Sequence, residues 1–398
     1  MSESNPSEAR PTFGLVVLLG ALSAFSPLAI DMYLPGFPEI ERDLHAAPGA
    51  LELTLSVFLA GLAIGQLVCG PLSDRWGRKP TLLLGCVGFA LSAALCAVVR
   101  SVEELIVLRF LMGFSGAAGL VVARAIVRDR FNETDSSRMY SMMMLVTGIA
   151  PIVAPSLGGQ LLWLGGWRSV FWTLTLCGAA CALAVAAGLS ESLPPTRRHR
   201  HTARALFRIY GDLLRDRRFM SYTLAIGCAS ALLFSYITSA PFLFRTLHGV
   251  DAQTFGLLFA GNAVGLFGAA QVNRRLLRYR SPEAILRAAS LLNAAAGLGL
   301  LAATLAQFGG LPLLWGSLFL CLATLGFIFP NATAAAMAPH AQHAGTASAL
   351  LGAFQYTLGA TAGAAVGLWH EGTALPAAAL IALCALCGAV TTWRRAAE

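Results

Sequence analysis

The residue whose chemistry stands out first is Asp31, a single carboxylate in a long apolar stretch. No other acidic or basic residue lies between Pro11 and Gly36. A carboxylate inside a bilayer costs about 2.5–3.5 kcal/mol on insertion scales, so it is a functional candidate. Pro27 and Pro35 indicate irregular backbone on either side of it. The alternative is that Asp31 sits at the outer headgroup boundary and only ends the span.

Arg109 is a second charge inside an apolar run. At the helical rise per residue, Asp31 and Arg109 lie about 6 Å and about 9 Å from the outer ends of their runs. Low dielectric favours the protonated carboxyl group, whereas a nearby arginine favours the carboxylate. This opposition predicts a proton-coupling pair, unless Arg109 snorkels to the outer surface. Glu52 has comparable depth, but Glu52 and Pro48 also fit the first turn of a helix.

The elements that position these charges are membrane spans. The chain has 398 residues, of which 57% are apolar and 12% are charged, whereas soluble domains carry about 25% charged residues. The net charge of +8 comes from arginines clustered in short segments between apolar runs. Aromatic residues do not interleave with these arginines, so we expect no nucleic-acid partner. The nine cysteines all fall inside apolar runs and are interpreted as packing residues.

Twelve apolar runs are long enough to cross a bilayer as helices, which takes about 20 residues. The N-terminus lacks the features of a cleaved signal peptide, so the first span is expected to be retained. If the N-terminus is inside, most lysines and arginines fall on the inner side, which predicts that both termini are cytoplasmic. The runs are 13–35, 49–71, 80–100, 103–127, 138–162, 167–189, 219–241, 254–276, 284–306, 311–334, 344–369 and 373–393.

The runs divide into two halves. The longest connection, 190–218, begins with prolines and carries the densest charge, which predicts a solvated, partly helical linker. A basic turn before a proline follows the second run, at 70–80, and recurs after the eighth, at 271–282. Two related halves with a site between them are a recurring plan. We therefore predict an N-terminal half at 1–189, a linker at 190–218 and a C-terminal half at 219–398.

The first basic turn reads GPLSDRWGRKP and contains one acid. Glycines permit a tight turn and close backbone approach. Asp74 is expected to pair with inner arginines or to sit at a helix N-terminus. We predict that this turn is a cytoplasmic gate that holds helix ends together. Its candidate residues are Gly70, Asp74, Arg75, Gly77, Arg78, Lys79 and Arg124.

Small residues and prolines recur in the fifth run, GIAPIVAPSLGG. Small residues allow close helix packing, and prolines bend a helix. The candidate residues are Gly148, Pro151, Pro155, Gly158 and Gly159. The eighth run offers a matching small face at Gly261, Gly265 and Gly268, and the eleventh offers Gly352, Gly359, Gly363 and Gly367. Ordinary membrane packing suffices to explain those last two sets.

These motifs resemble the major facilitator superfamily. The turn at 70–80 is similar to its signature loop between spans two and three. The stretch LRFLMGFSG at 108–116 resembles its fourth-span motif, in which an arginine matching Arg109 takes part in proton coupling. The run at 148–159 resembles its antiporter motif, with Ala154 where the strongest form has glycine. The stretches 31–35, 66–74, 151–159 and 234–242 look like the bicyclomycin/chloramphenicol resistance (Bcr/CflA) exporters.

The resemblance covers nearly the whole chain and implies an all-α, twelve-span fold of two pseudo-symmetric halves. It further implies proton-driven drug efflux in a bacterial inner membrane. Its expected partners are small-molecule drugs, protons and the bilayer, with a monomeric protein and no cofactor beyond the proton gradient. An exporter of a native sugar or amino acid derivative remains an alternative. A membrane enzyme is disfavoured, since HExxH, GxSxG and P-loop patterns are missing from the sequence, and the two-half pattern disfavours a channel or receptor.

The charge pattern also bears on the substrate. No acid lies between Phe13 and Ile30 or clearly inside spans seven to twelve, and Arg109 offsets Asp31. A cation in low dielectric needs an uncompensated partner, whereas a neutral or zwitterionic molecule needs hydrogen bonds. We therefore predict neutral or zwitterionic compounds in preference to lipophilic cations. The candidate cavity residues are Tyr33, Glu52, Asn262, Asn331, Gln355 and Tyr356.

Overall fold

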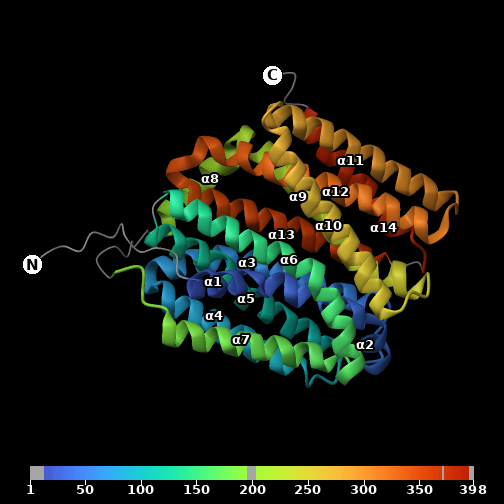
Figure 1. Cartoon of the computed structure of the whole chain (residues 1–398), viewed down its shortest axis with the longest axis horizontal. Coiled ribbons are helices and arrows are strands. Elements are labelled where there is room, and N and C mark those ends of the chain that lie inside the picture. Colours follow the sequence, from blue (N-terminus) through green and yellow to red (C-terminus); the bar gives the residue numbers. More distant parts are fainter. Residues whose placement is uncertain (1–12, 132, 195–202, 370–371, 394–398) are drawn as a thin grey trace, which may run out of the picture.

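The structure, a computed structural model, describes residues 13–131, 133–194, 203–369 and 372–393 (Figure 1). All of the elements in these ranges are helices. Twelve candidate spans are long and apolar enough to cross a membrane, which confirms the twelve predicted spans. The first half comprises α1 (Phe13–Asp31), η2 (Leu34–Gly36), α2 (Phe37–Asp43), α3 (Ala50–Trp76), α4 (Arg78–Cys96), α5 (Val102–Arg130), α6 (Glu133–Gly165) and α7 (Arg168–Gly188).

A further helix, α8 (Ala203–Arg215), precedes the second half. The second half comprises α9 (Arg217–Ala240), η4 (Pro241–Thr246), α10 (Ala252–Leu276), α11 (Pro282–Leu305), α12 (Gly310–Met337), η5 (Ala338–His343), α13 (Ala344–Leu368) and α14 (Leu375–Trp393). The helix α8 contacts α9 and α13 and lies within the predicted linker at 190–218, of which residues 195–202 fall outside the described residues. The linker stays a prediction. The boundaries of the two halves themselves stay a prediction.

Helix starts follow from capping residues. Ser101 accepts a hydrogen bond from the backbone N–H of Glu104 at the start of α5. Asp251 caps α10 and Ser281 caps α11 in the same way. Such side chains satisfy backbone donors that have no partner within the helix. These three helices therefore begin at a short polar residue, whereas α3, α4 and α12 begin after a glycine.

The two halves repeat one set of helix contacts. In the first half, α3 packs on α5, α4 packs on α5 and α7, and α1 packs on α6. In the second half, α10 packs on α12, α11 packs on α12 and α14, and α9 packs on α13. The order of helices is the same in both sets, so the halves are pseudo-symmetric as predicted.

The largest helix contacts between the halves are those of α3 with α13 and of α6 with α10. Along α13, a Cβ at Gly363 would lie 2.8 Å from Ser56 Oγ, and one at Gly367 would lie 2.9 Å from the Gly49 carbonyl. Only glycine permits such close approach. The predicted α10 face is wrong in part. Gly261 and Gly265 face Trp315 and Phe319 of α12, because the glycines make room for these two rings within the second half.

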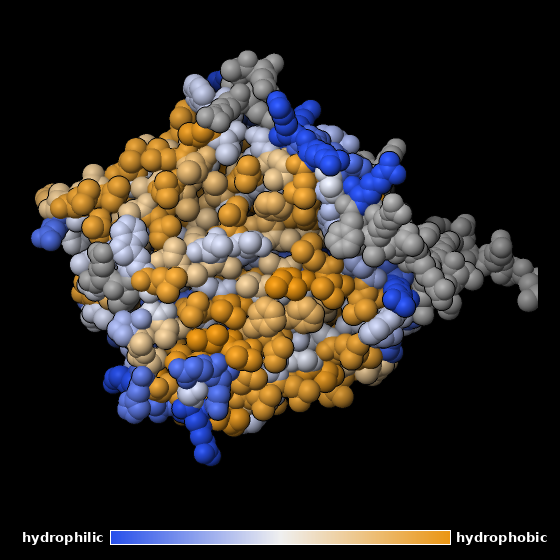
Figure 2. Space-filling model, turned by 180° about the vertical axis from the view of Figure 1, so that it is seen from behind, coloured by the Kyte–Doolittle hydropathy of each residue, from blue (hydrophilic) through white to orange (hydrophobic). Residues whose placement is uncertain are grey.

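The molecule has two polar ends, named here for helices that mark them. The α8 end carries α8 and the turn between α3 and α4, and the α2 end carries α2 and η4 (Figure 1). Figure 2 shows apolar side chains over the surface between groups of hydrophilic residues. Large apolar side chains of the spans are strongly exposed, including Trp163, Leu176 and Leu183. Such a surface is suited to contact with lipid.

Candidate functional site

Asp31 is the last residue of α1 and is only 3% exposed. The helical path does not simply stop there, because η2 and α2 continue it to Asp43. Asp31 therefore lies inside a helical segment of 30 residues rather than at its end. Among the residues that the structure describes, no salt bridge involves Asp31. It does interact electrostatically with Tyr236 of the second half.

Packing by α6 fixes the backbone next to Asp31. A Cβ at Gly158 would collide with the carbonyl oxygen of Met32, the residue after Asp31. Gly159 approaches Ala252 of the second half, at 3.1 Å from a Cβ to the carbonyl oxygen. Gly148 lies against Phe267, and Pro151 and Pro155 lie within α6. The small residues of the fifth run thus bring α6 against both α1 and α10.

Arg109 is fully buried in α5 and does not snorkel to the surface. Its Nη1 donates to the carbonyl oxygen of Ala29 at 3.0 Å and to the Met112 sulfur at 3.6 Å. The guanidinium lies over the Phe58 ring, 4.3 Å from its centroid, and over the Tyr33 ring at 4.8 Å. Stacking of this kind suits a weakly hydrated guanidinium. Arg109 therefore contacts the backbone just before Asp31 without forming a salt bridge to its carboxylate.

Tyr33 is directed into the first half. Its hydroxyl shares a hydrogen bond with Thr54 Oγ1 at 3.1 Å, and its ring packs against Phe37 and Phe171. Thr54 also donates to the Leu51 carbonyl at 2.6 Å. The Tyr33 hydroxyl thus holds the α1–η2 break against α3.

Several buried polar atoms make no hydrogen bond within the described residues. Four are hydroxyl oxygens of α9, and others come from α1, α3 and α10. Buried polar groups are costly unless they find a partner, so these atoms offer hydrogen bonds to a ligand or to water. The hydroxyl and amide groups among them belong to Ser26, Gln66, Thr223, Ser230, Ser235, Thr238 and Asn262, and the ionisable side chains to Glu52, Arg109, Arg245 and His340.

The predicted cavity residues fall into different environments. Asn262 donates to the Tyr236 hydroxyl at 2.9 Å, and its Oδ1 makes no hydrogen bond to any residue that the structure describes. Asn331 instead donates to Asn273 Oδ1 at 2.8 Å, which links α12 to α10. Gln355 and Tyr356 are half-buried on α13. The ring of Tyr356 lies 6.1 Å from that of Phe234, and its hydroxyl interacts electrostatically with Arg124.

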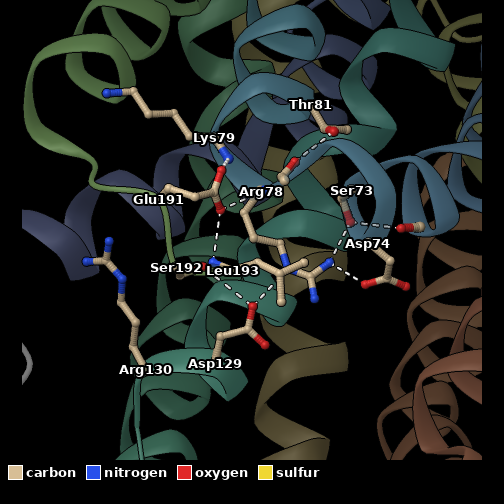
Figure 3. A network of polar contacts seen from close by, with 12 residues as sticks. Ser73, Asp74, Arg78, Lys79, Thr81, Asp129, Arg130, Glu191, Ser192 and Leu193 are labelled. Carbon is tan, nitrogen blue, oxygen red and sulfur yellow. Dashed lines mark hydrogen bonds and ion pairs between the residues drawn. The ribbon is translucent and has the colours of Figure 1, made fainter. Parts of the chain in front are cut away.

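The turn between α3 and α4 is organised by Arg78 (Figure 3). The side chain of Arg78 is only 4% exposed. Its Nη1 contacts Asp74 Oδ1 at 2.5 Å and Ser73 Oγ at 2.7 Å, and its Nε contacts Asp129 Oδ2 at 2.8 Å. One guanidinium therefore ties the end of α3 to the end of α5, and charge-assisted bonds of this kind are the strong ones.

Glu191 connects the same turn to the chain that follows α7 (Figure 3). Its carboxylate accepts from the backbone N–H of Arg78 at 2.9 Å and of Lys79 at 3.2 Å. A carboxylate at a helix N-terminus is stabilised by unpaired N–H groups and the helix dipole. Lys79 Nζ donates to the Ala186 carbonyl at 2.8 Å. Neither Asp129 nor Glu191 was among the sequence candidates, although both flank basic clusters.

The glycines of the turn differ in role. Gly77 has φ +108° and separates α3 from α4, a conformation that favours glycine. Gly70 lies within α3, and a Cβ there would meet only Val121 at 3.7 Å. The prediction that Gly70 permits close approach is therefore wrong, because no backbone lies near it. Arg75 is exposed.

At the α2 end, one ion pair joins the two halves. Arg245 of η4 contacts both carboxylate oxygens of Glu39 on α2, at 2.8 Å and 2.9 Å. Arg245 Nη1 also donates to the Pro35 carbonyl oxygen. The side chains are 13% and 30% exposed. This contact was not predicted from the sequence.

Metal chemistry has no evident ligands in the described residues, where no group of three His, Cys, Asp or Glu side chains could hold an ion. The nine cysteines are all free.

Comparison with known proteins gives consistent matches. A family model described as "Major Facilitator Superfamily" matches residues 19–364. A bicyclomycin resistance protein homolog of Haemophilus influenzae is 32% identical over 370 residues, 93% of each chain. The multidrug resistance protein MdtL of Klebsiella pneumoniae strain 342 is 32% identical over 335 residues, 84% of this chain and 83% of that protein.

Solved structures share the fold at low identity. An inward-facing, occupied structure of a bacterial homolog of the human lysosomal transporter Spinster has a TM-score of 0.76 at 15% identity, covering 99% of this chain and 98% of that one. A partially occluded inward-open xylose transporter from E. coli has a TM-score of 0.73 at 12% identity, covering 96% and 97%.

Proposed function

The chain belongs to the Major Facilitator Superfamily, and from this premise we propose that it exports drugs in exchange for protons by alternating access. It is a multi-pass membrane transporter and not an enzyme. The named relatives, a bicyclomycin resistance protein homolog and a multidrug resistance protein, support drugs as the substrate class. We further propose that it acts as a monomer, with the proton gradient as its energy source and no cofactor.

The observation that carries the proposal is the buried carboxylate of Asp31 at the break between α1 and η2. Asp31 is 3% exposed and its side chain has no salt bridge among the described residues. Burying an unpaired charge is costly, so a proton or a hydrogen-bonding ligand can each relieve it. Competition between the two for one carboxylate is the simplest physical basis of antiport. Arg109 contributes a buried positive charge near this carboxylate, since its Nη1 donates to the Ala29 carbonyl oxygen.

We assign the α8 end to the cytoplasm, with both termini, and the α2 end to the periplasm. The excess of arginine at the α8 end supports this assignment. At the α2 end the halves are joined by Glu39 and Arg245 and by the contact of Gly49 with Gly367. In the proposed cycle these outer contacts break when the protein opens outward. The Arg78 network and Arg124 act at the opposite, cytoplasmic side.

Neutral or zwitterionic compounds are the proposed substrates. The unpaired hydroxyl and amide groups of α9, α3 and α10 offer hydrogen bonds but no charge. The buried guanidinium of Arg109, which donates to the Ala29 carbonyl oxygen, adds positive charge near Asp31 that disfavours a cation. A molecule with hydroxyl or amide groups can therefore satisfy this lining, whereas a lipophilic cation has only Asp31 as a counter-ion. The same polar lining also favours the second candidate function, export of a native sugar or amino acid derivative.

Uptake into inverted membrane vesicles tests the proposal. We expect a chloramphenicol-like neutral drug to accumulate when a proton gradient is imposed, and accumulation to stop when an ionophore removes the gradient. Tetraphenylphosphonium should accumulate much less. Strong uptake of the cation with none of the neutral drug would overturn the substrate assignment. Uptake that persists without the gradient would overturn proton coupling.

A further inference from the structure

Beyond the proposed transport site, a separate cavity of about 240 Å³ opens between the halves at the α2 end. On the side of the first half, its wall comes from α2, the loop before α3 and the first turn of α3. On the side of the second half, its wall comes from η4. Pro48 and Thr246 are exposed at the α2 end, whereas Glu52 is buried. The lining comprises Phe37, Pro38, Glu41, Ala46, Pro48, Glu52, Pro241, Phe242 and Thr246.

Two carboxylates belong to this lining and no basic residue does. Glu52 is 3% exposed, and its Oε2 makes no hydrogen bond within the described residues. Glu41 is half-buried and interacts electrostatically with Glu52. Neither forms a salt bridge among the residues described, and the nearby guanidinium of Arg245 is bound by Glu39. The cavity therefore presents two carboxyl groups for which the described residues supply no salt-bridge partner.

The rest of the wall is apolar. Phe37 comes from the first half and Phe242 from the second, and three prolines complete the surface. A divalent metal ion requires about six to eight oxygen ligands, and this lining offers few beyond the two carboxylates. An organic cation suits it better, since its charge can meet the carboxylates while its carbon skeleton contacts the aromatic rings.

We propose that this cavity is an external binding site for a primary or secondary organic ammonium ion, distinct from the proposed transport site at Asp31. The N–H groups of the ammonium supply the donor that Glu52 Oε2 lacks, and Glu41 supplies the second counter-charge. Because the walls come from both halves, the bound ion holds the α2 end closed. Occupancy from the periplasm therefore inhibits the cycle without the ion being exported.

Binding is measured on the purified full-length protein in nanodiscs by calorimetry, so it does not depend on transport or on the proposed function. The probe is benzylammonium, and the matched neutral probe is benzyl alcohol. We expect benzylammonium to bind the wild type and benzyl alcohol to bind at least tenfold more weakly. Glu52→Gln and Glu41→Gln should each weaken benzylammonium binding at least tenfold. Glu103→Gln, which changes an exposed acid in the first turn of α5, should leave it unchanged.

A second readout checks the side of the membrane. Benzylammonium added outside right-side-out vesicles should slow drug efflux in the wild type and in Glu103→Gln, but not in Glu41→Gln. Glu41 is half-buried, so this variant keeps the test valid even if Glu52→Gln folds poorly. Equal binding of the two probes, or undiminished benzylammonium binding by Glu41→Gln, would overturn the proposal. Loss of drug efflux with intact benzylammonium binding would count against the proposed function alone.

Discussion

Removing the ion pair at the α2 end should open the outer face. Arg245 and Glu39 form a two-point contact between the halves, with side chains 13% and 30% exposed. Exposed pairs contribute about 0.2–1 kcal/mol, whereas close pairs across interfaces reach about 1.5–7 kcal/mol. With this intermediate exposure we expect about 1–2 kcal/mol, which changes the closed-to-open ratio about 5- to 30-fold. Arg245→Gln should shift the population toward outward-open by this factor.

Spin-label distances give the populations directly. Labels at Ala47→Cys and Leu247→Cys report the separation across the α2 end, because both positions are exposed and lie in different halves. The exposed native Cys387 is replaced by serine to avoid stray labelling. Glu39→Gln should have the same effect as Arg245→Gln, and the exchange of the two residues should restore part of the closed population. Identical distance distributions in wild type and Arg245→Gln would refute the assignment of this pair as an outer contact that stabilises closure.

Three further predictions concern other parts of the molecule. Arg78→Gln leaves Asp129 without its ion-pair partner and should lower the free energy of unfolding by about 3–5 kcal/mol. The exposed Arg75→Gln should change it by less than about 0.5 kcal/mol. Thermal unfolding in detergent checks both variants, and equal stability of the two would contradict the network. Gly158→Ala forces a Cβ against the Met32 carbonyl and should abolish drug efflux, whereas Gly70→Ala should retain it. Similar efflux by the two variants in a resistance assay would contradict the α6–α1 contact. Asp216 caps the start of α9, where its carboxylate accepts hydrogen bonds from the backbone N–H groups of Arg218 and Phe219. Partial burial raises the pKa of Asp216, but these hydrogen bonds and the nearby His340 outweigh the effect of burial, so the pKa is lowered overall. The stability that this cap contributes is therefore fully present above pH 3.8, the usual pKa of aspartate, and is lost as the pH falls below the lowered pKa. Acid unfolding should show this loss for the wild type but not for Asp216→Asn.

Local patterns in the sequence were enough to predict the twelve spans, because apolar length alone identifies a helix that must satisfy its backbone within a bilayer. Asp31 and Arg109 could be selected for the same reason, since a charge in an apolar run is costly. The continuation of α1 through η2 into α2 was missed. Prolines indicate a break when only the sequence is read. In the structure they occupy the first turns of η2 and α2, where a proline is tolerated.

The partners of charged residues could not be predicted, because they come from distant parts of the chain. Glu191 is 113 residues from Arg78, and Glu39 is 206 residues from Arg245. The contact of Glu191 with Arg78 depends on how segments of the first half meet, and the contact of Glu39 with Arg245 depends on how the two halves meet. Neither contact can be predicted from the helical periodicity of the nearby sequence. The unpaired hydroxyls of α9 were likewise invisible, since serine and threonine are ordinary residues in a membrane helix until their burial is known.

The central claim, that a proton and a drug compete for Asp31, is tested most directly by proton release from the purified protein. The protein is held in weakly buffered detergent with a pH-sensitive dye, and a neutral drug that it exports is added at saturating concentration. We expect the wild type and Glu104→Gln, which changes an exposed acid of α5, to release protons on binding. Asp31→Asn should bind the drug, as shown by calorimetry, and release none. Undiminished proton release by Asp31→Asn with drug bound would contradict the account.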